Sequence, residues 1–371
     1  MKSALHNKGV ATLLAAGALT LATGPALAES QVVNVYNWAN SIGKDTVANF
    51  EKTTGIKVEY QTFDSNDTVQ AKLLTGSAQY DVVVPSNLYW TRQIPTGVFQ
   101  QMDLKKIPNY GKLDPKIMNI LKSADPTQRY GLPWAWGTDG MGINVEKVQA
   151  ALGKNAPLDS LALFFDVNNL KKLKSCGVSI VDEPLDGFGI ALLALHKDPN
   201  TTNRKDYDEA YKLLKTLRPY ITQFNSSTYI NDLAGGDVCL ALGWSGDVNA
   251  ARRAALAAKK PYHIRYVIPK EGAAVWFNMM SIPKNAPHPD AAHKFINFVL
   301  SERESANLTN DTNYPSAVPG ANPLVSPEAL ADPMIYPTPE VFRRLYVGKP
   351  VAPDLMRYQN RLWTQLKSGI N

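Results

Sequence analysis

The first part of the sequence alternates between segments typical of β-strands and segments typical of α-helices. Runs rich in β-branched and aromatic residues predict strands at 32–38, 56–63 and 80–84, and helices are expected between them at 44–53 and 67–74. Short links join these five segments, and parallel strands need such crossover helices. The pattern therefore predicts an α/β fold in which a mostly parallel sheet is covered by helices on both faces.

Residues 131–145 interrupt this alternation with Gly, Pro and two Trp before an extended run resumes. We interpret this segment as a first crossing between two lobes, and the strands expected at 264–269 and 275–283 as a return crossing. At roughly 150 residues per domain, a chain of 371 residues also favours two domains over one. The expected division is 29–136 with 277–320 for lobe 1, and 137–276 with 321–371 for lobe 2.

The remaining segments continue the same mixture of elements. Strands are expected at 177–181 and 238–244, and helices at 186–195, 205–217, 248–259, 289–306 and 354–367. The expected helix at 289–306 places Phe295, Ile296 and Val299 along one face, which predicts that this face packs against a core.

Residues 1–28 have the features of a cleaved secretory signal peptide. Lys2 and Lys8 precede an apolar run at 10–23 that is too short to span a membrane, and residues 26–28 (Ala-Leu-Ala) form a small-x-small cleavage pattern. The alternative is a buried N-terminal helix. No later apolar run approaches about 18 residues, so we expect an exported and soluble protein.

The chain has only two cysteines, Cys176 and Cys239. An oxidising compartment favours a disulfide over free thiols, and closing so long a loop would stabilise the fold by roughly 4 kcal/mol in the chain-entropy model. The alternative is two separately buried thiols. No His lies close to either cysteine in the sequence, so neither is expected to be catalytic.

The motif search argues against several classes of function. The surplus of 39 Lys+Arg over 33 Asp+Glu is scattered, which gives little support to nucleic-acid binding. No phosphate-binding Gly-rich motif and no HExxH occurs, and His288 and His293 are not on one helical face, so no nucleotide, metal or other cofactor is predicted.

An exported hydrolase is the alternative class, and one motif bears on it. Residues 41–44 (Ser-Ile-Gly-Lys) match the SxxK of serine acyl-transferases, but no SxN element follows at the place where that fold needs one. We interpret Ser41 instead as the cap of a helix that starts near Lys44. Because no base–nucleophile constellation remains, we expect that the protein is not an enzyme.

Aromatic residues mark the ends of the expected strands. Trp38 ends the first strand, Ser86 follows the third, and Trp244 ends a middle strand with Asp247 three residues further on. Ligands of parallel sheets bind at the carboxyl ends of the strands, and aromatic faces beside a carboxylate suit an alkylammonium ion. The alternative is that the Trp side chains pack in the core or at hinges and that Asp247 is a helix N-cap.

Eight dispersed segments then carry a resemblance to a known family. They are 35–38 (VYNW), 45–58 (DTVANFEKTTGIKV), 63–66 (FDSN), 80–86 (YDVVVPS), 173–179 (LKSCGVS), 226–248 (SSTYINDLAGGDVCLALGWSGDV), 268–272 (IPKEG) and 363–369 (WTQLKSG). Over nearly all of the mature chain the sequence resembles the periplasmic polyamine-binding proteins of ABC transporters, and within them the putrescine-binding branch.

The resemblance implies a two-lobed type II periplasmic binding protein whose lobes close on a small amine ligand. It also implies a disulfide between Cys176 and Cys239, no catalysis, and a monomer in the periplasm whose partner is an ABC permease with its ATPase. Carried over by position, the ligand set has aromatic walls, polar contacts and an acid. These are Trp38, Trp244, Trp276 and Tyr314 as walls, Ser86 and Asp247 as polar contacts, and Asp186 as the acid.

The sequence also departs from the family at this ligand set. After the first Trp the family usually has Ser-Asp-Tyr, whereas this chain has Ala39, Asn40 and Ser41; where the family has an acid after two aromatic residues, this chain has Asn278. Two acids have therefore become amides, and an aromatic wall has become Ser.

These departures predict a shift in specificity. Each end of a diamine in a closed site needs an acid, so we expect weaker putrescine and spermidine binding than is usual in the family. The preferred ligand would then have one ammonium group, held by Asp186 and Asp247, as in an ω-amino acid. The alternative is that these two acids already balance a dication. A sensor that signals to a membrane receptor has the same fold, and the sequence does not separate it from a transport receptor.

Overall fold

The structure is a computed structural model that describes residues 31–75 and 79–369, so the signal peptide expected at 1–28 lies outside the described residues. A first sheet has three parallel strands in the order β2-β1-β3. Its strands are β1 (Val32–Trp38), β2 (Lys57–Phe63) and β3 (Val82–Val83), linked by the helices α1 (Thr46–Thr54) and α2 (Asn66–Leu74). The predicted alternation of strands and helices is therefore confirmed in this part of the chain.

A second sheet has seven strands in the order β10-β9-β4-β7-β5-β6, with β8 also paired to β4. They are β4 (Leu132–Asn144), β5 (Val178–Ile180), β6 (Gln223–Phe224), β7 (Leu240–Trp244), β8 (Ile264–Val267), β9 (Ala273–Met280) and β10 (Leu345–Val347). The α/β fold is confirmed. This sheet is mixed rather than mostly parallel, however, because the long strand β4 runs antiparallel to β7, β8 and β9.

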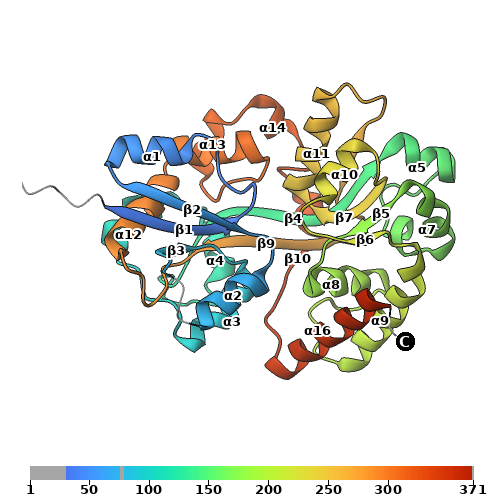
Figure 1. Ribbon diagram of the computed structural model, residues 1–371, viewed down its shortest axis with the longest axis horizontal. Coiled ribbons are helices and arrows are strands. Elements are labelled where there is room, and N and C mark those ends of the chain that lie inside the picture. The colour runs from blue at the N-terminus through green and yellow to red at the C-terminus, as the bar shows by residue number, and fades with distance from the viewer. Residues whose placement is uncertain (1–30, 76–78, 370–371) are drawn as a thin grey trace, which may run out of the picture.

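Strands β4 and β9 run lengthwise through the molecule and connect its two halves (Figure 1). The core of the first half is a hydrophobic cluster around β1–β3, which includes Trp134 at the start of β4 and Phe277 on β9. The second half contains two clusters on the two faces of β7, and Met141 at the other end of β4 belongs to one of them. One strand pair thus carries side chains of both halves.

Helices cover the sheets of both halves. They are α3 (Asn87–Gln93), α4 (Pro115–Leu121), α5 (Val145–Leu152), α6 (Ala162–Phe165), α7 (Val167–Leu173), α8 (Pro184–Ala194), α9 (Arg204–Leu217), α10 (Tyr229–Gly235), α11 (Ser245–Ala257), α12 (Pro289–Val299), α13 (Glu302–Thr312), α14 (Pro327–Ala331), α15 (Pro339–Phe342) and α16 (Pro353–Ser368). Among the described residues, no helix is long and apolar enough to cross a membrane.

The prediction of a single helix at 289–306 is wrong, because the structure has two helices there. Helix α12 ends at Val299, and α13 begins at Glu302 after a new N-cap at Ser301. The Ser301 hydroxyl accepts a hydrogen bond from the backbone N–H of Glu304, which satisfies a donor at the start of the second helix. The apolar face that was predicted is buried, with Phe295, Ile296 and Val299 all in the core.

The segment after α13 packs back onto that helix. Ala321, Val325, Ala329 and Ile335 form a small cluster with Ala306 of α13. The same segment reaches the second half of the molecule through an ion pair between Asp332 and Arg252 of α11. The chain then enters β10, which pairs with β9, and ends in α16 in the second half (Figure 1).

Candidate functional site

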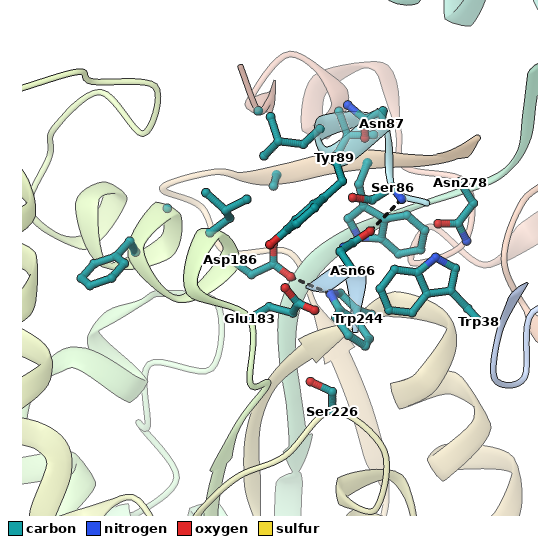
Figure 2. A pocket seen from close by; sticks show the side chains of 18 of the residues that line it. Trp38, Asn66, Ser86, Asn87, Tyr89, Glu183, Asp186, Ser226, Trp244 and Asn278 are labelled. Carbon is teal, nitrogen blue, oxygen red and sulfur yellow. Dashed lines mark hydrogen bonds between the residues drawn. The ribbon is translucent and has the colours of Figure 1, made fainter. Parts of the chain in front are cut away.

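A cavity with about 1240 Å³ of empty space, part of it open to solvent, lies where the two halves meet. All ten side chains that the sequence singled out line this cavity. They are Trp38, Asn40, Ser41, Ser86, Asp186, Trp244, Asp247, Trp276, Asn278 and Tyr314. Figure 2 shows Trp38, Ser86 and Asn278 on one side of the cavity, with Asp186 and Trp244 facing them from the other half of the chain.

The cavity forms where strands of both sheets end, which is the place expected from their topology. Trp38 is the last residue of β1 and Trp244 the last residue of β7. Their rings meet across the cavity with centroids 5.9 Å apart in an edge-on arrangement. Two strands from different halves thus place one aromatic contact at their junction, and the side chains belong to a site rather than to either core alone.

Ser86 follows β3 and occupies the N-cap position of α3, but its side chain makes no capping hydrogen bond. Its backbone N–H donates to the Asn66 side chain over 3.0 Å, and its backbone pairs with Asn278 of β9. The local backbone is therefore held by α2 and β9, and the hydroxyl is not used in capping the helix.

Asp247 lies in the first turn of α11 and is only 7% exposed. Both of its carboxylate oxygens accept hydrogen bonds from tyrosines: Tyr229 donates to Oδ2 over 3.1 Å, and Tyr314 donates to Oδ1 over 2.9 Å. Burial raises the pKa of Asp247 to about 6, although these two hydrogen bonds oppose the rise. The alternative of a plain helix cap is wrong, because the N-cap is Trp244.

A glycine makes this arrangement possible. A Cβ at Gly246 would lie 2.4 Å from the ring of Tyr314, so only glycine lets that ring pass against the start of α11. The Tyr314 ring in turn packs edge-on against Trp276, with centroids 5.3 Å apart. The aromatic wall and the carboxylate therefore depend on one small residue next to Asp247.

Asp186 lies in the first turn of α8, and its carboxylate faces the cavity. The indole Nε1 of Trp244 donates to Asp186 Oδ2 over 2.9 Å. The surrounding protein desolvates the carboxylate and raises the pKa of Asp186 to about 6, while the Trp244 hydrogen bond opposes the rise.

The sequence reasoning missed two further acids at this place, Glu183 and Asp139. Glu183 is 5% exposed and lines the cavity, and Asp139 is 6% exposed on β4, directly opposite Trp244 in the β4–β7 pairing. Burial raises the pKa of each well above its ordinary value, and the Asp186 carboxylate adds to both shifts. Glu183 could have been found, because it comes two residues after the strand expected at 177–181. Asp139 could not, because it lies inside a strand that crosses between the two halves.

The neutral polar residues Asn40, Ser41 and Asn278 lie on the half of the molecule that contains β1–β3. Asn278 is 4% exposed on β9, and Asn40 is exposed, with a φ of 57° that Asn tolerates better than most residues. Ser41 is buried and its hydroxyl donates to the carbonyl of Ala39 over 3.3 Å. The interpretation of Ser41 as a helix cap is wrong, because the N-cap of α1 is Asp45.

The cavity is strongly biased towards negative charge. Among the described residues, four acids line it, against one basic side chain, the exposed Lys349; the acids are Asp64, Glu183, Asp186 and Asp247. Within the described residues, Glu183, Asp186, Asp247 and Asp139 take part in none of the ion pairs. In the same part of the chain, no group of His, Cys, Asp and Glu is arranged to hold a metal ion. The excess of carboxylates can stabilise a cation in the cavity.

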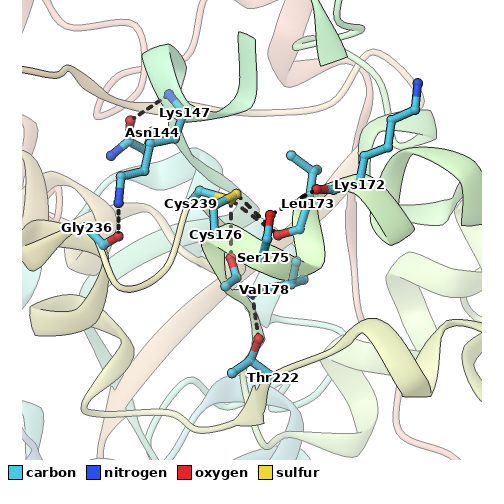
Figure 3. The surroundings of a disulfide bond; sticks show 11 residues. Asn144, Lys147, Lys172, Leu173, Ser175, Cys176, Val178, Thr222, Gly236 and Cys239 are labelled. Atoms are coloured by element: carbon cyan, nitrogen blue, oxygen red, sulfur yellow. Dashed lines mark hydrogen bonds between the residues drawn. A yellow bond between two sulfur atoms is a disulfide. The ribbon is translucent and has the colours of Figure 1, made fainter. Parts of the chain in front are cut away.

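The disulfide between Cys176 and Cys239 is present, with 5.5 Å between the Cα atoms (Figure 3). It joins the turn before β5 to the residue before β7, which are neighbouring parallel strands. The predicted pairing is confirmed, and the alternative of two free thiols is wrong. The bridge fastens the two strands whose ends lead to Glu183 and Trp244.

Comparison with known proteins agrees with this geometry. Residues 45–337 match the family described as bacterial extracellular solute-binding protein. The chain is 44% identical over 368 residues to a putrescine-binding periplasmic protein of Escherichia coli (strain K12), covering 99% of this chain and 100% of that protein. It is also 44% identical to a putrescine-binding periplasmic protein of Pseudomonas aeruginosa (strain UCBPP-PA14), over 95% of this chain and 97% of that protein.

A solved structure supports the same conclusion. The spermidine/putrescine ABC transporter substrate-binding protein of Streptococcus pneumoniae superposes with a TM-score of 0.74 at 26% identity, covering 91% of this chain and 99% of that chain. The predicted resemblance to solute-binding proteins is therefore confirmed by sequence and by fold.

Proposed function

The chain belongs to the bacterial extracellular solute-binding proteins, and on that premise we propose that it binds a linear polyamine of the putrescine and spermidine class. It delivers this ligand to an ABC permease and its ATPase in the inner membrane. It acts as a monomeric receptor in the periplasm, where the segment at 1–28 directs it. Proteins of this family bind and release their solute, so the chain is not an enzyme.

One observation carries the proposal of a cationic ligand: the cavity contains buried carboxylates that form no ion pair with any of the described residues. Asp247 and Asp186 both face the cavity, and neither has a Lys, Arg or His partner among the described residues. Trp38 and Trp244 supply aromatic faces beside them. An alkylammonium ligand satisfies both features, since its methylenes pack on the rings and its charge meets the acids.

An ω-amino acid is the second candidate, and Asn40 and Asn278 favour it. An Asn side chain can donate to a carboxylate as well as accept from an ammonium group, so two amides suit a neutral or anionic ligand end. Glu183 weighs against this candidate, because it adds a third buried carboxylate to the same cavity. A ligand carboxylate would enter a site that already has a large excess of negative charge.

Binding is expected to close two lobes around the ligand. We place lobe 1 at 29–136 and 277–320 and lobe 2 at 137–276 and 321–371, with crossings near 135–138 and 275–280 and a third beyond Tyr314. A ligand that contacts both lobes favours the closed form, because only that form makes all of its contacts. Small-angle scattering of the protein with and without ligand should show compaction on binding; no compaction with a bound ligand would contradict the lobes proposed here.

The test of the ligand class is a thermal-shift panel followed by calorimetry, with putrescine, spermidine, 4-aminobutyrate and 5-aminovalerate. Stabilisation by the two polyamines and none by the amino acids supports the proposal. The reverse result would establish the ω-amino acid alternative.

The double variant Asn40→Asp with Asn278→Asp sharpens this test. It restores the two acids usual in the family, and it should strengthen polyamine binding and weaken any binding of an ω-amino acid. Position 40 has a φ of 57°, which Asp tolerates as Asn does, so the change does not add backbone strain. The variant Asp159→Asn, at an exposed acid outside the cavity, serves as a control for handling and charge.

Transport and sensing differ in the partner rather than in this site. Loss of labelled-polyamine uptake in a strain without the gene, restored by the intact chain, supports the transport role. Normal uptake together with a lost transcriptional response to the ligand would instead support a sensor.

A further inference from the structure

The cavity is also lined by residues that lie away from the strand ends described above. They come from α8, α9, β10 and α16 and from the loops beside β10, and the three helices pack against one another (Figure 1). We call the lining residues within 188–207 and 346–359 the α16 side of the cavity. Among the described residues, none of those that line this side is an acid, so it differs in chemistry from the rest of the site.

The α16 side is continuous with the acidic part of the cavity through Tyr346 of β10. Its hydroxyl lies against α8, where a Cβ at Gly189 would come within 2.3 Å of it, so glycine permits this approach. Burial raises the pKa of Tyr346 well above its ordinary value, and the carboxylates of Asp139 and Asp186 add to the rise. Tyr207 adds to it as well. Tyr346 is therefore near both the acids and the neutral residues of the α16 side.

Gln359 of α16 is a buried amide with an unused acceptor. It is 1% exposed and lines the cavity, and its Oε1 has no hydrogen-bond partner among the described residues. Burial raises the pKa of Tyr207, and the Gln359 amide opposes the rise. The Tyr207 hydroxyl donates to the carbonyl of Thr201 over 2.9 Å, so it can only accept from the NH₂ of Gln359. The amide is thus oriented with its oxygen unpaired, which favours an N–H donor from a ligand.

The charge on the α16 side disfavours a further ammonium group. Within the described part of the chain, the basic side chain that lines it is Lys349. Asn200 holds the backbone there, because it donates to the carbonyl of Val347 over 3.1 Å and accepts from the N–H of Lys349 over 2.7 Å. A ligand ammonium on this side would face a positive charge without a lining carboxylate to offset it. A neutral polar group does not incur this cost.

An amide group has the hydrogen-bonding groups that this side can use. Its N–H can donate to Oε1 of Gln359, and its carbonyl can accept from the hydroxyl of Tyr346. A diamine that is acylated on one nitrogen combines such an amide with one remaining ammonium group. The acids of the cavity suit the ammonium group, and the α16 side suits the amide.

We propose that the α16 side of the cavity binds the amide group of a diamine acylated on one nitrogen, whose free ammonium group is held by the acids of the same cavity. The inference rests on the proposed function and extends its ligand class to N-acylated polyamines. It assigns to Gln359 and Tyr346 the recognition of the amide.

The test compares two amines of equal chain length with and without an amide. Calorimetry with N-acetylputrescine, n-heptylamine and spermidine is carried out on the wild-type protein, on Gln359→Met, and on Gln365→Met, which makes the same change at an exposed position of α16. The wild type should bind N-acetylputrescine about tenfold or more tightly than heptylamine. Gln359→Met should reduce this ratio about 3- to 10-fold, the effect of one hydrogen bond between neutral groups. Gln365→Met should keep the wild-type ratio.

The variant Tyr346→Phe is a second check, because it removes the hydroxyl that meets the amide carbonyl. It should reduce the same ratio, and it stays informative where Gln359→Met does not fold. Equal binding of the two amines by the wild type, or an equal loss for both in the variants, would overturn the inference. A loss confined to spermidine would instead assign the α16 side to a further ammonium group. Tight putrescine binding alongside any of these results leaves the proposed function intact, whereas failure to bind any diamine or polyamine would overturn both.

Discussion

Replacement of Asp247 by Asn tests the part of the site that the proposed function depends on most. The change keeps the size of the side chain, removes its charge and replaces one acceptor oxygen by an NH₂ donor. In the protein the carboxylate is 7% exposed and accepts hydrogen bonds from Tyr229 and Tyr314. These bonds occupy one position on each oxygen and leave further acceptor positions for a ligand ammonium group.

The expected magnitude follows from the burial of Asp247. An ammonium group without its carboxylate in a dry site is left uncompensated, which costs roughly 3–5 kcal/mol. At about 1.4 kcal/mol for each tenfold change, the Kd for putrescine should rise roughly 100- to 5000-fold. The stability of the ligand-free variant should be unchanged or higher, because burial disfavours the charge that the variant removes.

Calorimetry with putrescine and thermal unfolding without ligand measure the two effects separately. Asp159→Asn is the matched control, since it makes the same chemical change at an exposed position and should leave both quantities unaltered. Tyr314→Phe keeps the charge of Asp247 but removes one of its hydrogen bonds, so it should weaken binding less than Asp247→Asn. Unchanged putrescine affinity in Asp247→Asn would refute the reasoning and leave Asp247 as a structural partner of the two tyrosines.

The other predictions concern the aromatic wall, the disulfide and pH. Trp244→Ala should weaken putrescine binding, measured by calorimetry, by less than Asp247→Asn, because it removes ring contact and not charge; an equal or larger loss would contradict this order. Replacing Cys176 and Cys239 together by Ala should lower the free energy of unfolding by roughly 4 kcal/mol, measured by urea denaturation; unchanged stability would contradict the expected constraint on the unfolded chain. Between pH 7 and pH 5 the putrescine affinity should fall about tenfold for each of Asp186 and Asp247, because protonation through a pKa of about 6 removes the charge that the ligand needs. For the same two groups the ligand-free stability should move in the opposite direction, rising as the pH falls from about 7 towards 4, since their folded pKa values exceed the ordinary ones; a flat affinity profile would refute both statements.

The elements that the sequence predicted well are those decided by local composition. Residues 32–38 form β1 as expected, because the run is rich in β-branched and aromatic side chains, which favour a strand. Four of the cavity residues, Trp38, Ser86, Trp244 and Asp247, were also within reach, since ligands of parallel sheets bind where strands end. The other six were implied only by the family resemblance. The break between α12 and α13 could not be predicted, because a serine such as Ser301 occurs both as an exposed residue within a helix and as a helix cap.

The two missed acids show a different limit. Nothing in the sequence around Asp139 distinguishes it from an exposed acid, and only the pairing of β4 with β7 sets it opposite Trp244. The burial of Glu183 likewise depends on the approach of α2 from the other half of the chain. Burial of a charged residue is a property of tertiary neighbours, so periodicity within one segment does not reveal it.

The distribution of charge across the cavity has a consequence for the order of binding. The carboxylates of Asp186, Asp247 and Glu183 belong to the second half of the molecule. The first half, around β1–β3, contributes Trp38 and the amide of Asn278. In the proposed scheme a cation therefore binds first to the second half, where the Coulomb attraction is concentrated. The first half then closes over a ligand whose charge is already compensated, and it adds aromatic contact and hydrogen bonds rather than charge. Asn278 in place of an acid thus leaves closure dependent on contact area, which is weakened less by salt than an ion pair across the junction would be.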